Sequence, residues 1–286
     1  MRPGAPVRIE RGAAAPELGD EALGGFLREV LGRYRFTASE ERTASTGAAV
    51  DPEMLGRAFE SLMASRERRA SGSFYTPSSF VGRVADEGLL RALAALLPPS
   101  AHPAVDALAG SIVPHRSLLQ ATQAALGRLT VLDPACGSGA FLVHALERLA
   151  AWRRLAGDDR CSDTIRRELL ANSLFGIDRD PTAVWLCELR LWLAVAVECN
   201  EPDPRRVLPL PNLDRNIRVG DALAPLAGGS HSGVLTPRTG AERFVTLRAR
   251  YARASGARKE RAAMTLDAAE RALSVASVDR EIEHVR

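Results

Sequence analysis

The sequence predicts an α/β fold in which three parallel strands alternate with helices, with a helical region before them and a helical extension after them. Residues 129–132 form an apolar run that meets an aspartate, a glycine-rich turn and an amphipathic segment over 141–152. Two more short segments predicted as strands, 174–177 and 217–219, also lead to aspartates. Strands that alternate with helices form parallel sheets through right-handed crossovers.

Residues 1–70 are expected to hold a disordered start followed by helices. The first 18 residues are rich in Ala, Pro and Gly, a composition typical of disorder. One helix is predicted over 21–34. Another begins at the Asp-Pro-Glu sequence at 51–53, which supplies an N-cap, a proline at the first helical position and an acid in the first turn. The basic run at 66–69 fits a solvated helix end or a contact with backbone phosphates.

Residues 71–128 are expected to form a second region before the sheet. The sequence Gly-Ser-Phe-Tyr-Thr-Pro at 72–77 breaks the preceding helix, and a new helix is predicted from Ser78 or Ser79 to about 97. Four prolines between 98 and 116 predict a loop or linker with little regular structure. A helix over 117–127 then leads into the first strand.

Residues 129–226 carry the predicted βα units, and residues 227–286 a helical insertion or extension. Within the first range, helices are expected at 162–171 and from Asp180-Pro181 to about 198, the second being apolar nearly all round and so buried between two layers. In the second range, helices are predicted over 243–254 and 258–284. Apolar residues of the last helix alternate at spacings of four and three, which predicts a seam for helix packing.

Composition narrows the class of protein. The chain is 46% hydrophobic and 26% charged, as in ordinary soluble proteins. No apolar run is long enough to cross a bilayer and the first residues lack the core of a secretion signal, so a cytoplasmic location and no membrane partner are expected. The net charge of +3 does not indicate nucleic acid by itself. The four cysteines show no metal-binding spacing and are expected to be buried reduced thiols.

Three aspartates follow the three predicted strands: Asp133, Asp178 and Asp221. In an open α/β sheet, the carboxyl ends of the strands line the ligand crevice. Gly137 and Gly139 allow unusual dihedral angles and a close approach of ligand, next to the amides that begin a helix. The turn matches neither the dinucleotide pattern nor the phosphate-binding loop, and no cluster of basic residues adjoins it. Three acids in one register therefore favour a nucleoside ligand such as S-adenosylmethionine over NAD or ATP, although one such acid alone would be read as a cap of a helix.

Four segments in this order strongly resemble the amino-terminal half of gamma-type N6-adenine DNA methyltransferases. These are enzymes of Type I and Type IIG restriction–modification systems and of BREX- and DISARM-like phage-defence systems. The segments are the Gly-Ser-Phe-Tyr-Thr-Pro at 72–77, Asp-Pro-Ala-Cys-Gly-Ser-Gly at 133–139, Phe-Gly-Ile-Asp-Arg-Asp-Pro at 175–181 and Gly-Asp-Ala-Leu at 220–223. The resemblance covers about residues 25–225. It implies the first three strands of a Rossmann-like S-adenosylmethionine-dependent methyltransferase sheet.

The resemblance also implies which residues bind the cofactor. Tyr75, Thr76 and Pro77 resemble the motif that closes over the methionine end of the cofactor. Asp133, Ala135, Cys136, Gly137 and Gly139 resemble the main cradle of the cofactor. Asp178 matches the acid that binds the ribose, with Ile177 or Arg179 beside the adenine. Asp221 matches the acid that accepts from the adenine amino group, with Leu223 near the ring. The matching positions are Tyr75, Thr76, Pro77, Asp133, Ala135, Cys136, Gly137, Gly139, Asp178, Arg179, Asp221 and Leu223.

The family's catalytic motif, Asn/Asp-Pro-Pro followed by an aromatic residue, is absent from the sequence, so no catalytic residue is assigned. In the family this motif holds a flipped adenine of double-stranded DNA for attack on the cofactor methyl group. The expectation is therefore a fragment or split subunit, inactive alone, with a partner polypeptide that carries the catalytic half and pairs with the open edge of the first strand. No metal site is expected, and the only lysine, Lys259, does not complete a nuclease motif.

Two alternative functions remain open from the sequence. One is a non-catalytic cofactor-binding or scaffold subunit of a defence complex. The other is a methyltransferase that acts on RNA or on a protein amide, because related enzymes share the cofactor turn. The Tyr-Thr-Pro segment favours DNA by resemblance only.

Overall fold

The computed structural model describes residues 35–36, 49–50, 76–199, 201, 203, 206–223 and 241–285. The chain divides into two units, residues 1–37 with 42–50, and residues 38–41 with 51–286. In the first unit, strands β1 (Arg35–Phe36) and β2 (Ala49–Val50) form a short parallel pair that the sequence did not predict. The helices predicted over 21–34 and from residue 51, and the basic run at 66–69, lie outside the described residues.

The second unit is built on a parallel sheet of β3 (Val131–Asp133), β4 (Leu174–Asp178) and β5 (Ile217–Val219), in the order β3-β4-β5. Asp133 pairs with Gly176 and Asp178 pairs with Val219, so the three strands end at one edge of the sheet. The three predicted parallel strands are confirmed. The first strand begins two residues later than predicted, because Leu129 is the buried C-cap of the preceding helix.

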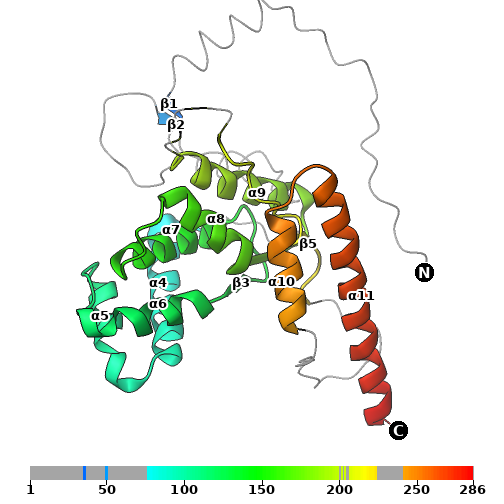
Figure 1. The fold of residues 1–286 in the computed structure, drawn as a ribbon, viewed down its shortest axis with the longest axis horizontal. Helices are drawn as coiled ribbons and strands as arrows, with labels where there is room; N and C mark the ends of the chain where they lie inside the picture. Colours follow the sequence, from blue (N-terminus) through cyan, green and yellow to red (C-terminus); the bar gives the residue numbers. More distant parts are fainter. Residues whose placement is uncertain are drawn as a thin grey trace, which may run out of the picture. The chain divides into compact units, whose positions relative to one another are not determined.

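Helices surround this sheet, and those of the second unit are coloured from cyan to red in Figure 1. Most begin and end within a few residues of the predicted positions. They are α4 (Ser78–Leu96), α5 (Pro103–Ala109), α6 (Leu119–Arg128), α7 (Ala140–Leu155), α8 (Ser162–Asn172), α9 (Pro181–Ala196), α10 (Ala241–Ala252) and α11 (Ala257–Val285). No helix in these ranges combines the length and the apolarity needed to cross a membrane.

The prediction of a loop over 98–116 was wrong. This segment contains α5 and two 3₁₀ turns, η2 (Pro99–Ala101) and η3 (Arg116–Leu118). Pro103 occupies the first turn of α5, where the missing N–H costs nothing because that donor has no partner inside the helix. Ala104 and Leu108 are fully buried and fix α5 to the core. The prolines therefore start short helices here.

The core of this unit is centred on α7. This helix contacts β3, β4 and the helices α4, α6, α8 and α9. Its buried side chains include Leu142, Leu146, Leu149 and Trp152, all of which are essentially inaccessible to solvent. Because α7 follows directly from the glycine-rich turn, its packing fixes the position of that turn on the sheet.

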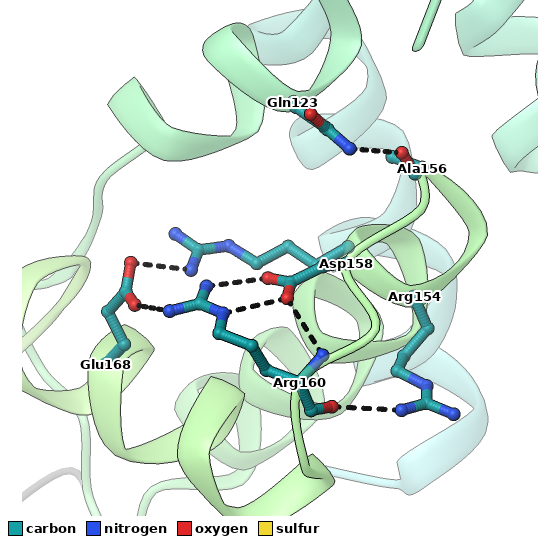
Figure 2. Close-up of polar contacts among 7 residues, drawn as sticks. Gln123, Arg154, Ala156, Asp158, Arg160 and Glu168 are labelled. Carbon is teal, nitrogen blue, oxygen red and sulfur yellow. Dashed lines mark hydrogen bonds and ion pairs between the residues drawn. The ribbon is translucent and has the colours of Figure 1, made fainter. Parts of the chain in front are cut away.

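The connection between α7 and α8 is held by ion pairs (Figure 2). Arg160 donates to both carboxylate oxygens of Asp158, at 2.8 and 2.7 Å, and forms an ion pair with Glu168 of α8. Glu168 also accepts a hydrogen bond of 3.0 Å from Arg153 of α7. The side chain of Arg153 is only 8% exposed. Glu168 is therefore the carboxylate that neutralises a buried arginine and joins the two helices.

Replacing Glu168 with glutamine is expected to lower the free energy of unfolding by about 2 kcal/mol at neutral pH, because the buried Arg153 loses its charged partner. Burial acts to raise the pKa of Glu168, but hydrogen bonds from Arg160 and Arg153 outweigh it and the pKa is lowered below 4.5. The carboxylate thus stabilises the fold above that ordinary value, and this contribution disappears as the pH falls through the lowered value.

Urea unfolding of the wild type and Glu168→Gln over this acidic range checks the prediction. The difference between the two proteins should shrink as the pH falls. Asp159→Asn, in the same connection and exposed, is the matched control and should unfold like the wild type. An equal loss in both variants would contradict the assignment.

Candidate functional site

The glycine-rich turn between β3 and α7 has two glycines in the left-handed region. Gly137 has φ +51° and Gly139 has φ +88°. A Cβ on Gly139 would lie 2.6 Å from the Sγ of Cys187, so no side chain fits there. A Cβ on Gly137 would meet nothing within 4 Å. The turn is therefore packed tightly against α9 at Gly139 and open at Gly137, where a ligand has space to approach the backbone.

Asp178, the last residue of β4, connects its strand to this turn. Its Oδ2 accepts from the amide of Gly137 at 2.8 Å, and its Oδ1 accepts from the amide of Asp180 at 2.9 Å. Asp133, the last residue of β3, accepts from the amide of Ala135 at 3.1 Å. Burial raises the pKa of Asp133, the hydrogen bond from Ala135 opposes this, and the charge of Asp178 raises the pKa further. The two carboxylates thus lie close enough to repel each other.

The third acid, Asp221, follows β5. Its Oδ1 accepts from the amide of Leu223 at 3.0 Å, and its Oδ2 lies 3.6 Å from the Nε of Arg179, which follows β4. The amide of Gly220 donates to the carbonyl of Asp178 at 2.8 Å and ties the two loops together. The structure therefore brings all three predicted acids to the same edge of the sheet. Leu223 is 92% exposed.

The Thr-Pro end of α4 lies beside the start of α7. A Cβ on Gly82 would be 3.4 Å from the His144 ring of α7, and Asp86 accepts from Arg148 at 2.9 Å. His144 and Arg148 each lie 62 positions after their partners in α4, Gly82 and Asp86. The first residues of the two helices, Ser78 and Ala140, are separated by the same number of positions. The two helices are therefore parallel and begin at the same level. This places Thr76 and Pro77 next to the glycine-rich turn, while Tyr75 lies outside the described residues.

Two charged residues of α9 were missed by the sequence analysis. Arg190 is 2% exposed, and its Nη1 donates to the carbonyl of Ser138 at 2.8 Å, inside the glycine-rich turn. Burial and the charge of Asp214 raise the pKa of Glu188 to about 7, against the opposing charge of Lys259. The available signal was the presence of these charges in a helix that is otherwise apolar nearly all round. Arg190 supports the turn from behind.

The cysteine prediction was right in part. Cys136 in the turn and Cys187 in α9 are buried free thiols, and a hydrogen bond between them together with burial raises the pKa of Cys187. Cys161, however, is exposed at the start of α8, where the short connection from α7 runs along the surface. Among the described residues, no three His, Cys, Asp or Glu side chains gather as metal ligands.

Comparison with known proteins places these features in a family context. Residues 110–225 match the model of the MmeI DNA-methyltransferase domain. The chain is 27% identical over 224 residues to a protein of Methanocaldococcus jannaschii named "Putative type II restriction enzyme and methyltransferase RM.MjaORFECS2P". The alignment spans 71% of this chain and 19% of that relative. No solved structure matches the chain.

The α/β fold, the glycine-rich turn and the family match together support a methyltransferase domain. The matching family model and the name of the relative indicate a similarity to methyltransferases of restriction–modification type. The matched range contains β3, β4 and β5 and the three acids at their carboxyl ends, but begins after α4 and α5.

Proposed function

We propose that this chain binds S-adenosylmethionine as the cofactor-binding part of a cytoplasmic DNA methyltransferase that modifies adenine at N6. The observation that carries the proposal is that Asp133, Asp178 and Asp221 lie at one edge of the sheet, where Asp178 accepts from the amide of Gly137 in a turn that is open at that residue. Two arginines beside this edge already have partners within the protein, since Arg179 lies 3.6 Å from the carboxylate of Asp221 and Arg190 donates to the Ser138 carbonyl. The edge therefore offers acceptors for hydroxyl and amino groups and lacks a clamp for phosphates.

The residues divide the proposed binding task by position. Asp178 accepts from the ribose hydroxyls with the lone pairs that its two amide hydrogen bonds leave available. Asp221 accepts from the adenine amino group, with Arg179 and Leu223 flanking the ring. The cradle is formed by Asp133, Ala135, Cys136, Gly137 and Gly139. Tyr75, Thr76 and Pro77 close over the methionine end of the cofactor. When bound, the cofactor supplies an activated methyl group.

DNA as the substrate and N6 of a flipped adenine as the target are supported by the motif order and by the name of the relative. The catalytic Asn/Asp-Pro-Pro-aromatic motif must then come from another polypeptide segment, because it is not in this sequence. Among the described strands, β3 pairs only with β4, and Leu132 on β3 is 60% exposed. This unpaired edge is where we propose that a further strand of the complete enzyme is added.

The proposed cofactor is tested by calorimetric titration of the purified chain. S-adenosylmethionine and S-adenosylhomocysteine are expected to bind with micromolar dissociation constants, whereas ATP and NAD are not, because the site lacks phosphate-binding groups. Absence of heat with S-adenosylmethionine at millimolar concentration would contradict the proposal, as would equal binding of ATP.

A second candidate function is a non-catalytic cofactor-binding subunit, and the missing catalytic motif favours it. Both functions predict cofactor binding. Transfer of a radiolabelled methyl group to duplex DNA by the chain, together with a polypeptide that carries the catalytic motif, separates them. Methylation of DNA by the mixture supports the methyltransferase. If only RNA or protein becomes labelled, the substrate is that polymer and not DNA.

A further inference from the structure

A large groove lies between the helices α10 and α11, away from the three strand-end acids. Figure 1 shows these helices side by side as a hairpin. The groove has a volume of about 1010 Å³ and is lined by both helices and by Asn172 at the end of α8. Four arginines line it: Arg250, Arg253, Arg258 and Arg261.

The positive charge of this groove has no counterpart within the described chain. No aspartate or glutamate lines the groove. All four arginines are exposed, and none forms an ion pair with another described residue. Further along α11, Asp267 pairs with Arg215 and Glu270 with Arg218. Glu260, in the first turn of α11 between Arg258 and Arg261, is exposed and does not line the groove.

The positions of two of these arginines also argue against a purely structural role. Arg258 and Arg261 lie at the start of α11, which begins at Ala257. A positive charge at the N-terminal end of a helix opposes the helix dipole. Their charge therefore does not stabilise the helix on which they lie, whereas an anion bound in the groove would be attracted both by the arginines and by the helix end.

The groove is part of a well-anchored scaffold. The guanidinium of Arg248 in α10 stacks 4.1 Å from the ring centre of Phe175 in β4. The hydroxyl of Tyr251 donates to Asp214 at 2.7 Å, and the side-chain amide of Asn212 donates to the carbonyls of Tyr251 and Ala254. These contacts fix the end of α10 and the following turn against the segment that precedes β5, so the arginines are presented from a defined position.

We propose that this groove binds the phosphodiester backbone of duplex DNA. The proposal rests on the proposed function for the choice of DNA. Arginine binds phosphate with two parallel hydrogen bonds, and four of them with no acidic neighbour in the groove fit a polyanion. The residues that line the groove run from Val245 to Ala254, in α10 and just after it, and from Arg258 to Thr265 in α11, a length that suits a continuous backbone better than a single small anion. Such contacts hold and orient DNA without reading its sequence.

The test measures binding of a fluorescent mixed-sequence DNA duplex by anisotropy over a range of salt concentrations. Each lost phosphate contact should reduce the slope of log K against log salt by about 0.9. The double variant Arg258→Gln/Arg261→Gln is expected to weaken binding by roughly tenfold or more at low salt and to flatten the slope by about 2 units. The double variant Arg250→Gln/Arg253→Gln should do the same.

Arg116→Gln/Arg128→Gln is the matched control, since it removes the same total charge from two exposed arginines that do not line the groove. It should leave affinity and slope nearly unchanged. Equal weakening in this control, or unchanged DNA binding in both groove variants, would overturn the proposal. So would binding that depends on the groove arginines for vesicles of anionic lipid but not for duplex DNA.

Calorimetric titration with S-adenosylmethionine keeps this proposal apart from the proposed function. The groove variants should bind the cofactor like the wild type, because the groove lies outside the strand-end site. If the cofactor does not bind but DNA binding still depends on the groove, the groove stands and the cofactor site fails. If the cofactor binds and the groove variants bind DNA like the wild type, the cofactor site stands and the groove proposal fails.

Discussion

Replacing Gly139 with valine is expected to lower the free energy of unfolding by about 4 kcal/mol. The residue has φ +88°, a left-handed conformation that a β-branched side chain adopts only under strain. Its Cβ would also lie 2.6 Å from the Sγ and 3.3 Å from the Cα of Cys187. Because Cα belongs to the backbone of α9, a change of side-chain rotamer does not remove the clash. The turn or the helix has to move.

Urea unfolding measures this loss, and two other glycines act as controls. Gly88 lies within α4 with open space around it, so Gly88→Ala is expected to stabilise the protein by up to about 1 kcal/mol. Gly137 has φ +51° without any clash, so Gly137→Ala should cost about 1 kcal/mol from backbone strain alone. If Gly139→Val unfolds like Gly137→Ala, the tight contact between the turn and α9 is wrong.

The sheet was predictable because its signals are local. Each of the three strands is a short segment that leads to an aspartate, and β5 was predicted residue for residue. Asp180 and Pro181 marked the start of α9 correctly, since an N-cap and a first-turn proline need no tertiary contact. The same rule applied to Pro103 would have found α5. The prediction of a loop over 98–116 instead relied on the number of prolines in that segment and overlooked that Pro103 is at a position where a helix can begin.

The contacts that hold the site together were not predictable from local patterns. The bond from Arg190 to the Ser138 carbonyl joins residues 52 positions apart, and the bond from Gly137 to Asp178 joins residues 41 positions apart. A sequence window shows Arg190 only as a charge in an apolar helix. The parallel packing of α4 on α7 likewise depends on the Asp86 contacts with His144 and Arg148. The sequence predicts which residues meet a ligand, and the fold shows which residues hold them.

Asp178 has a proposed contact with the cofactor and also holds the glycine-rich turn, so its removal is expected to cause the largest loss of cofactor affinity. Asp178→Ala should weaken S-adenosylmethionine binding by at least about 100-fold, which corresponds to about 2.7 kcal/mol. The variant loses the carboxylate that we propose accepts from the ribose hydroxyls. In the wild type the amide of Gly137 donates to Asp178 at 2.8 Å. The variant lacks this hydrogen bond, so the open part of the turn loses its fixed position. Calorimetric titration of the variant measures the loss.

Asp180→Ala separates the loss of cofactor contact from a simple loss of stability. Asp180 caps α9 by accepting from the amide of Thr182 at 2.8 Å, and its removal is expected to cost about 1 kcal/mol of stability. Its carboxylate has no proposed contact with the cofactor, so affinity should stay at the wild-type level. If Asp178→Ala folds cooperatively and binds S-adenosylmethionine like the wild type, Asp178 serves only to hold the turn. In that case the ribose of the cofactor does not bind at Asp178.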